Sequence, residues 1–179
     1  MSHHSNEARL EEILAICMAE LFAEQGVNAE RFLGEHEPLS LRESLTAFCG
    51  FGSAHFRGSL TILGSVALFS RLHPLPTNMS PRNLADWACE LINQIAGRYR
   101  NHLLAYDVSL ALAVPQSAIA ENVQLSSRLR RMRNPICFSI DNTVLEAWLE
   151  LNIRPGFKLA DAPTDEAAAA FRAGSVLFF

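Results

Sequence analysis

The chain has 179 residues, of which 49% are hydrophobic and 19% are charged, and its formal net charge is −4. This composition is typical of a globular protein with a sizeable core, so we expect a single domain over residues 1–179. The small negative charge argues against a nucleic-acid partner. There is neither a signal-peptide core nor an apolar run of about 20 residues, which predicts a cytoplasmic protein with no membrane partner.

The first part of the chain predicts a helix and then a β-hairpin. Apolar residues recur at helical spacing from about residue 7 to 25, and Gly26 is a typical stop. After a polar loop, the period changes to two in "SLTAFCGF" and "HFRGSLTILG", which flank a glycine-containing turn. We therefore expect two antiparallel strands, followed by a short helix around "SVALFSRL" that ends before Pro74.

The longest regular pattern is a helix expected from Pro81 to about residue 104. Ser80 is a good N-cap, and Pro81 suits the first helical position. One side of this helix is apolar, and its members are Leu84, Trp87, Ala88, Leu91, Ile92 and Ile95. The opposite side carries a polar stripe on the 3.6-residue period, made of Asp86, Glu90, Asn93, Gln94 and Gly97.

Three further strands are expected downstream. The segment 107–114, "DVSLALAV", alternates and ends at Pro115, which has no N–H for a ladder. The segments "ICFSI" and "TVLEAWLEL" are joined by Asp141 and Asn142 alone, which predicts a hairpin. The apolar face of the first of these strands consists of Val108, Leu110, Leu112 and Val114. This order of elements predicts an α+β fold in which a largely antiparallel sheet lies under long helices.

The last segment, residues 153–179, is looser, so we place the core of the domain at about 7–152 and treat 153–179 as a C-terminal extension. Within it, "DEAAAAFRAG" predicts a short helix, and the final "SVLFF" is an apolar cluster that either adds a strand or meets a second subunit. The basic cluster "RLRRMR" at 128–133 is either an electrostatic guide for an acidic partner or a solvated loop.

Cysteine and histidine spacing predicts neither a disulfide nor a metal site. The four cysteines lie far apart among apolar neighbours and form no C-x-x-C, which is typical of buried thiols. The six histidines show no metal-ligand spacing.

The polar stripe permits two interpretations. Surface helices commonly have a solvated polar side, so an acid and an amide one turn apart are a weak signal by themselves. A glycine inside a helix, however, costs about 1 kcal/mol relative to alanine, which indicates that Gly97 serves close packing or the close approach of a partner. The carboxamide of Asn93 can donate and accept at once, and a helix holds it with little freedom, which suits the positioning of a water.

The sequence Asp86-x-x-x-Glu90-x-x-Asn93, followed by Gly97 and by Pro115 twenty-two residues beyond the asparagine, resembles the signature of the CheC/CheX/FliY family of chemotaxis phosphatases. The segments "FRGSLTILGS" and "VSLALAVP" resemble the family's strands before and after the helix. The chain carries this motif once, and in this it is similar to the CheX-like members of the family. The resemblance covers the core defined above and implies a CheX-like α+β fold.

The resemblance also implies a function: a protein aspartyl-phosphate phosphatase that acts on a phosphorylated CheY-type response regulator. Asn93 would position the attacking water, Glu90 would anchor the partner, and Asp86 and Gly97 would support the motif. Mg²⁺ would be supplied by the regulator, so no cofactor is expected in this chain, and a homodimer is implied. Two alternatives stay open: a non-catalytic dimeric adaptor that binds a response regulator or another signalling protein, and a small-ligand-binding domain that uses the sheet face.

Overall fold

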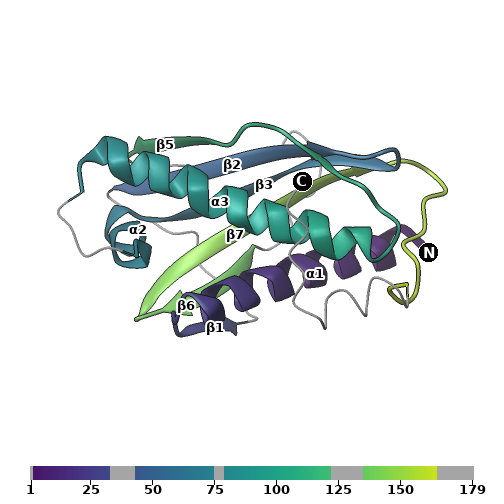
Figure 1. The fold of residues 1–179 in the computed structure, drawn as a ribbon, viewed down its shortest axis with the longest axis horizontal. Helices are drawn as coiled ribbons and strands as arrows, with labels where there is room; N and C mark the ends of the chain where they lie inside the picture. Colours follow the sequence, from purple (N-terminus) through teal and green to yellow (C-terminus); the bar gives the residue numbers. More distant parts are fainter. Residues whose placement is uncertain (1, 33–42, 75–78, 122–134, 165–179) are drawn as a thin grey trace.

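The computed structural model describes residues 2–32, 43–74, 79–121 and 135–164. In chain order the elements are α1 (Ser2–Glu24), β1 (Ala29–Phe32), β2 (Ser44–Gly52), β3 (Phe56–Ser65), α2 (Val66–Leu72), α3 (Pro81–Leu104), β4 (Ala111–Leu112), β5 (Gln116–Ala120), β6 (Ile136–Ile140) and β7 (Thr143–Ile153). Figure 1 shows the two long helices, α1 and α3, side by side on one face of a single sheet.

All pairings in this sheet are antiparallel, in the order β1-β6-β7-β3-β2-β4, and β5 also pairs with β2. Both predicted hairpins are confirmed, because β2 pairs with β3 and β6 pairs with β7. Asp141 and Asn142 have φ of 47° and 60°, as a two-residue type I′ turn requires. The predicted α+β fold, with a largely antiparallel sheet under long helices, is confirmed.

The core lies between the helices and the sheet face that they cover. Edge-to-face ring contacts join the layers: Phe22 of α1 meets Phe138 of β6 with ring centroids 5.5 Å apart, and Tyr99 of α3 meets Phe51 of β2 at 5.9 Å. Such pairs each contribute about 0.5–1.5 kcal/mol beyond the burial of their area. They fix both helices on the sheet, so the outer side of α3 is a rigid surface.

The predicted strand over 107–114 is wrong in its extent and in its end. Only two of its residues form β4, and the chain pairs with β2 again after Pro115, as β5. The register shifts by one residue between β4 and β5, so that Val114 and Pro115 lie opposite Cys49 alone, which is a β-bulge. A proline is tolerated in a bulge on an edge strand because no ladder N–H is needed there. Val114, expected on the apolar face, is instead 84% exposed.

One strand was not predicted, and three predicted or open features lie outside the described residues. Strand β1 was not predicted from the sequence; its four residues show no alternation of burial, and it pairs with β6 at the sheet edge. The helix predicted in "DEAAAAFRAG", the "SVLFF" cluster and the "RLRRMR" segment lie outside the described residues. Among the described helices, none is both long enough and apolar enough to cross a membrane.

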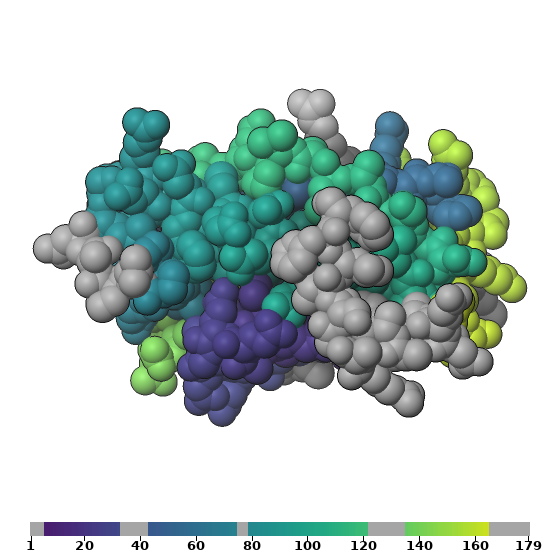
Figure 2. Space-filling view, in the orientation of Figure 1, coloured from purple at the N-terminus to yellow at the C-terminus, as the bar shows by residue number. Residues whose placement is uncertain are grey.

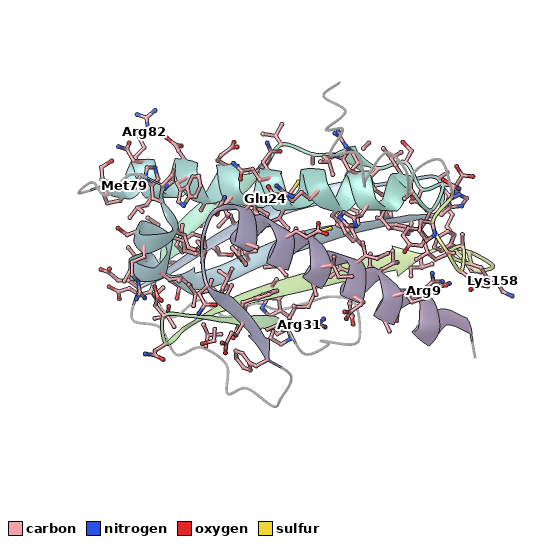
Figure 3. All side chains as sticks on the ribbon, turned by 60° about the horizontal axis from the view of Figure 1, so that its bottom comes forward. Arg9, Glu24, Arg31, Met79, Arg82 and Lys158 are labelled. Carbon is pink, nitrogen blue, oxygen red and sulfur yellow. The ribbon has the colours of Figure 1, made fainter. Side chains whose placement is uncertain are left out.

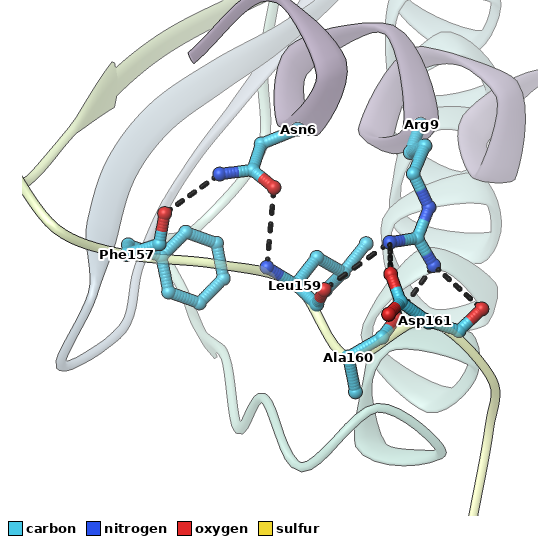
Figure 4. Close-up of polar contacts among 6 residues, drawn as sticks. All are labelled: Asn6, Arg9, Phe157, Leu159, Ala160 and Asp161. Atoms are coloured by element: carbon cyan, nitrogen blue, oxygen red, sulfur yellow. Dashed lines mark hydrogen bonds and ion pairs between the residues drawn. The ribbon is translucent and has the colours of Figure 1, made fainter. Parts of the chain in front are cut away.

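The first part of the C-terminal extension, residues 154–164, has no helix or strand but is fixed to α1 (Figure 4). Asn6 donates a hydrogen bond to the carbonyl of Phe157 at 2.7 Å and accepts one from the backbone N–H of Leu159 at 3.2 Å. Arg9 donates to the carbonyl of Leu159 at 3.1 Å, and its guanidinium lies over the ring of Tyr106. These contacts contradict the expectation of a loose segment for this part of the extension.

Candidate functional site on the outer side of α3

Helix α3 begins as the sequence predicts. The Ser80 side chain accepts a hydrogen bond from the backbone N–H of Asn83 at 3.2 Å, and Pro81 occupies the first turn. Burial of one side then fixes the rotation of the helix about its axis. The buried residues are Leu84, Ala88, Leu91, Ile92, Ile95, Ala96, Tyr99 and Leu103. Trp87, expected among them, is only half-buried.

The polar stripe therefore faces outward. The side chains of Asp86, Glu90 and Asn93 are exposed, while Gln94 and Gly97 are half-buried. Figure 2 shows the first half of α3 (teal) at the surface of the molecule, next to α1 (purple). An acid and an amide one turn apart are thus presented to solvent on a helix whose other side is packed in the core.

One hydrogen bond joins two residues of the stripe, and a second connects the stripe to Gln25, the residue directly after α1. The side-chain N–H of Gln94 donates to Oε1 of Glu90 at 2.8 Å, and the side-chain N–H of Gln25 donates to Oε1 of Gln94 at 3.2 Å. Asn93 makes no side-chain hydrogen bond to any other described residue. No role was predicted for Gln94, although a Glu and a Gln four residues apart on a helix can be recognised as a pair. No sequence pattern indicated a role for Gln25.

An ion pair and a second polar contact join α1 to α3 beside the stripe. Arg98 donates to Oε1 of Glu24 at 3.0 Å and also to the second oxygen of this carboxylate. Figure 3 shows Glu24 at the boundary between the two helices. The hydrogen bond from Arg98 lowers the pKa of the Glu24 carboxyl. One turn further along α3, His102 lies 2.9 Å from Glu20, so the two helices are antiparallel and joined along this seam.

Gly97 has no packing reason within the described part of the fold. A Cβ built on it would meet no atom within 4 Å outside its own stretch of helix. Of the two explanations that the sequence left open for Gly97, close packing against the described residues is therefore excluded. Among the described residues, the space beside Gly97 is open.

The segment after Pro115 lies against α3. The Ser117 hydroxyl, on β5, donates to the carbonyl of Ala85 at 2.9 Å. This bond joins the bulged edge strand to the helical turn that carries Asp86. The proline and the helical part of the motif, far apart in sequence, therefore belong to neighbouring elements.

Other features of the molecule do not join this site. Within the described ranges, no three or more His, Cys, Asp or Glu side chains gather as metal ligands would. A hollow of about 680 Å³ has lining residues that include Gly50, Ser59, Glu150 and Asn152. These residues alternate with the core-facing ones, so the hollow lies on the sheet face away from the helices.

Several known structures of chemotaxis proteins have the same architecture. CheX from Desulfovibrio desulfuricans superposes with a TM-score of 0.62 and 13% identity, covering 82% of this chain and 99% of its own. CheX from Vibrio vulnificus gives a TM-score of 0.62 and 15% identity over 78% of this chain and 93% of its own. The chain has the fold of the CheX- and CheC-like proteins. The resemblance inferred from the stripe is thereby confirmed at the level of the fold.

A third CheX-like neighbour was solved with a bound protein. This is the CheX–CheY–BeF3–Mg²⁺ complex from Borrelia burgdorferi, with a TM-score of 0.54 and 12% identity over 79% of this chain and 96% of the other. No protein-family model and no curated protein matches the sequence. At these identities the likeness is one of fold, and any activity has to be argued from the side chains on α3.

Proposed function

We propose that this chain is an aspartyl-phosphate phosphatase that acts on a CheY-type response regulator. The observation that carries the proposal is the placement of Glu90 and Asn93, exposed and one turn apart on a rigid helix of a CheX-like fold. A CheX-like neighbour that binds CheY supports the choice of partner.

In the proposed reaction, α3 docks on the phosphorylated regulator. Glu90 pairs with a lysine ammonium of the partner and fixes the register of docking. The Asn93 carboxamide accepts one hydrogen bond from a water through its oxygen and donates another to a neighbouring oxygen atom through its N–H. Together these bonds orient the water toward phosphorus. The water adds to phosphorus, the bond between phosphorus and the aspartyl oxygen breaks, and the products are phosphate and the free aspartate.

This chemistry needs little from the chain beyond position. An acyl phosphate is a labile bond, and phosphoryl transfer is accelerated chiefly by orientation and by charges near the phosphoryl oxygens. The regulator supplies Mg²⁺, so the chain contributes an amide and a carboxylate. We also infer a homodimer of this chain, which light scattering of the purified protein tests.

The test is phosphate release from CheY-type regulators of the same organism, phosphorylated with acetyl phosphate. Wild-type chain is expected to accelerate release, and Asn93→Ala to lose about 100-fold or more of the acceleration while still binding the regulator. Asn83→Ala, a matched change at the start of the same helix, is expected to keep it. Binding without release by the wild type would instead identify the chain as an adaptor, and neither binding nor release would contradict both.

A further inference from the structure

Gln94 is the best-connected side chain of the polar stripe. Its amide is bonded on both sides, donating to Glu90 at 2.8 Å and accepting from Gln25 at 3.2 Å. The orientation of this amide follows from chemistry, because an ionised carboxylate can only accept. The Gln94 nitrogen must therefore face Glu90, which leaves its oxygen for the Gln25 nitrogen.

The far end of this chain of hydrogen bonds is itself held in place. Gln25 directly follows α1, and its backbone N–H still bonds to the carbonyl of Leu21 at 3.1 Å. Gly26, with φ of 70°, then turns the chain away. The neighbouring Glu24 is paired with Arg98, one helical turn beyond Gln94. The C-terminal end of α1 is thus bonded to α3 next to Gln94.

We propose that Gln94, itself fixed by Gln25, is a positioning residue that holds the Glu90 carboxylate in the orientation in which it binds the partner. This role rests on the proposed function, in which Glu90 anchors the regulator. A long exposed side chain loses rotamer freedom when it is captured at an interface, and ordering it beforehand reduces that cost. Asn93 takes part in neither hydrogen bond. The bonds of Gln94 therefore affect docking and leave the orientation of the water unchanged.

If Gln94 acts only on docking, its loss should raise KM and leave kcat unchanged. Gln94→Met keeps the length and helix propensity of the side chain but removes both hydrogen bonds. It is expected to raise KM for the phosphorylated regulator by about 2- to 10-fold, the cost of ordering one side chain at the interface, with kcat unchanged. Gln25→Met is expected to raise KM less, because the bond between Gln94 and Glu90 remains.

A double variant shows whether Gln94 acts through Glu90. If it does, Gln94→Met adds no further rise in KM in a Glu90→Gln background. Gln116→Met is the matched control, because this exposed glutamine pairs with Phe48 and points from the sheet face away from α3. The unfolding midpoints of all variants are compared with wild type, so that a folding defect is recognised.

Each outcome is informative. A wild-type KM in Gln94→Met, a loss confined to kcat, or an equal rise in KM in the Glu90→Gln background would overturn the positioning role and leave the phosphatase intact. In the last case, Gln94 would contact the regulator itself. A wild-type chain that neither binds nor dephosphorylates the regulators would overturn the proposed function, and this role with it.

Discussion

Glu90 and Asn93 lie three residues apart on the exposed side of α3, yet of these two side chains only that of Glu90 is hydrogen-bonded within the described part of the chain. The acid is fixed through Gln94, and the amide makes no bond to another described side chain or backbone group. This difference matches the two roles proposed for them: an anchor benefits from order before docking, and a water-positioning amide needs open donor and acceptor atoms.

Removal of the anchor should weaken docking without destabilising the fold. Glu90→Ala is expected to lower the affinity for a regulator held with beryllofluoride and Mg²⁺ by about 10-fold or more, because a lysine of the partner loses its counter-charge. The free energy of unfolding should stay near the wild-type value, since Glu90 is exposed. Titration calorimetry measures the affinity, and Glu30→Ala, an exposed acid on β1, is the control. Equal affinities for wild type and Glu90→Ala would refute the anchor.

Gly97 should show opposite effects on stability and on binding. Gly97→Ala adds a methyl group that meets no described atom within 4 Å, so it should stabilise the free chain by up to about 1 kcal/mol through helix propensity. The same methyl group should weaken regulator binding if a partner approaches closely there. Chemical denaturation and calorimetry measure the two effects, and a variant that is stabilised yet binds normally would exclude the partner as the reason for this glycine.

Gly58 provides the contrast. A Cβ on this residue would lie 2.0 Å from the carbonyl oxygen of Glu150 on β7 and 2.9 Å from the ring of Phe51. Because backbone cannot give way cheaply, Gly58→Ala should destabilise the protein by about 1–3 kcal/mol or more. A drop in the denaturant midpoint relative to wild type checks this, and an unchanged midpoint would mean that β3 and β7 are not so closely paired.

The contact between Asn6 and the segment after β7 should be a measurable part of the stability. Asn6 is 5% exposed, and its loss leaves the Phe157 carbonyl and the Leu159 N–H without their partner. Asn6→Ala should therefore lower the free energy of unfolding by about 1–3 kcal/mol. Asn152→Ala, a change at an exposed residue of β7, should change it little. Identical denaturation curves for the two variants would show that the segment is not held by Asn6.

One thiol should react before the others. Cys17, Cys49 and Cys137 are buried, whereas Cys89 on α3 is only half-buried. A disulfide reagent at neutral pH should titrate one thiol of the native chain quickly and all four after denaturation. Cys89→Ser should remove the fast phase. Two or more fast thiols in the wild type would indicate that the core opens more readily than its packing suggests.

Alkaline pH should destabilise the fold through the buried thiols. Burial raises the pKa of Cys137 to about 11 and raises that of Cys17 further. Above pH about 9 the unfolded chain therefore releases protons that the folded chain retains, so stability is complete below this value and falls as pH rises toward 11. Denaturation at pH 8 to 10.5 should show this decline, and Cys137→Ala should make it shallower. A flat profile in the wild type would contradict the shifts.

Much of the secondary structure and the outward face of α3 could be predicted because the signals are local. Ser80 and Pro81 define the start of α3, and the turn at Asp141 and Asn142 joins β6 to β7 with no other residue. The 3.6-residue period separates the buried side of α3 from Glu90 and Asn93. Each of these follows from residues within a turn or two of one another.

The tertiary structure decided the rest. Pro115 suggested a strand end, but pairing with β2 continues past it, because an edge strand can absorb a proline in a bulge. The bond from Gln25 to Gln94 spans 69 residues, and that from Asn6 to Phe157 spans 151. Local propensity is encoded by neighbouring residues and can be read directly. Which distant side chains meet depends on how the finished layers pack, and no short pattern in the sequence carries that information.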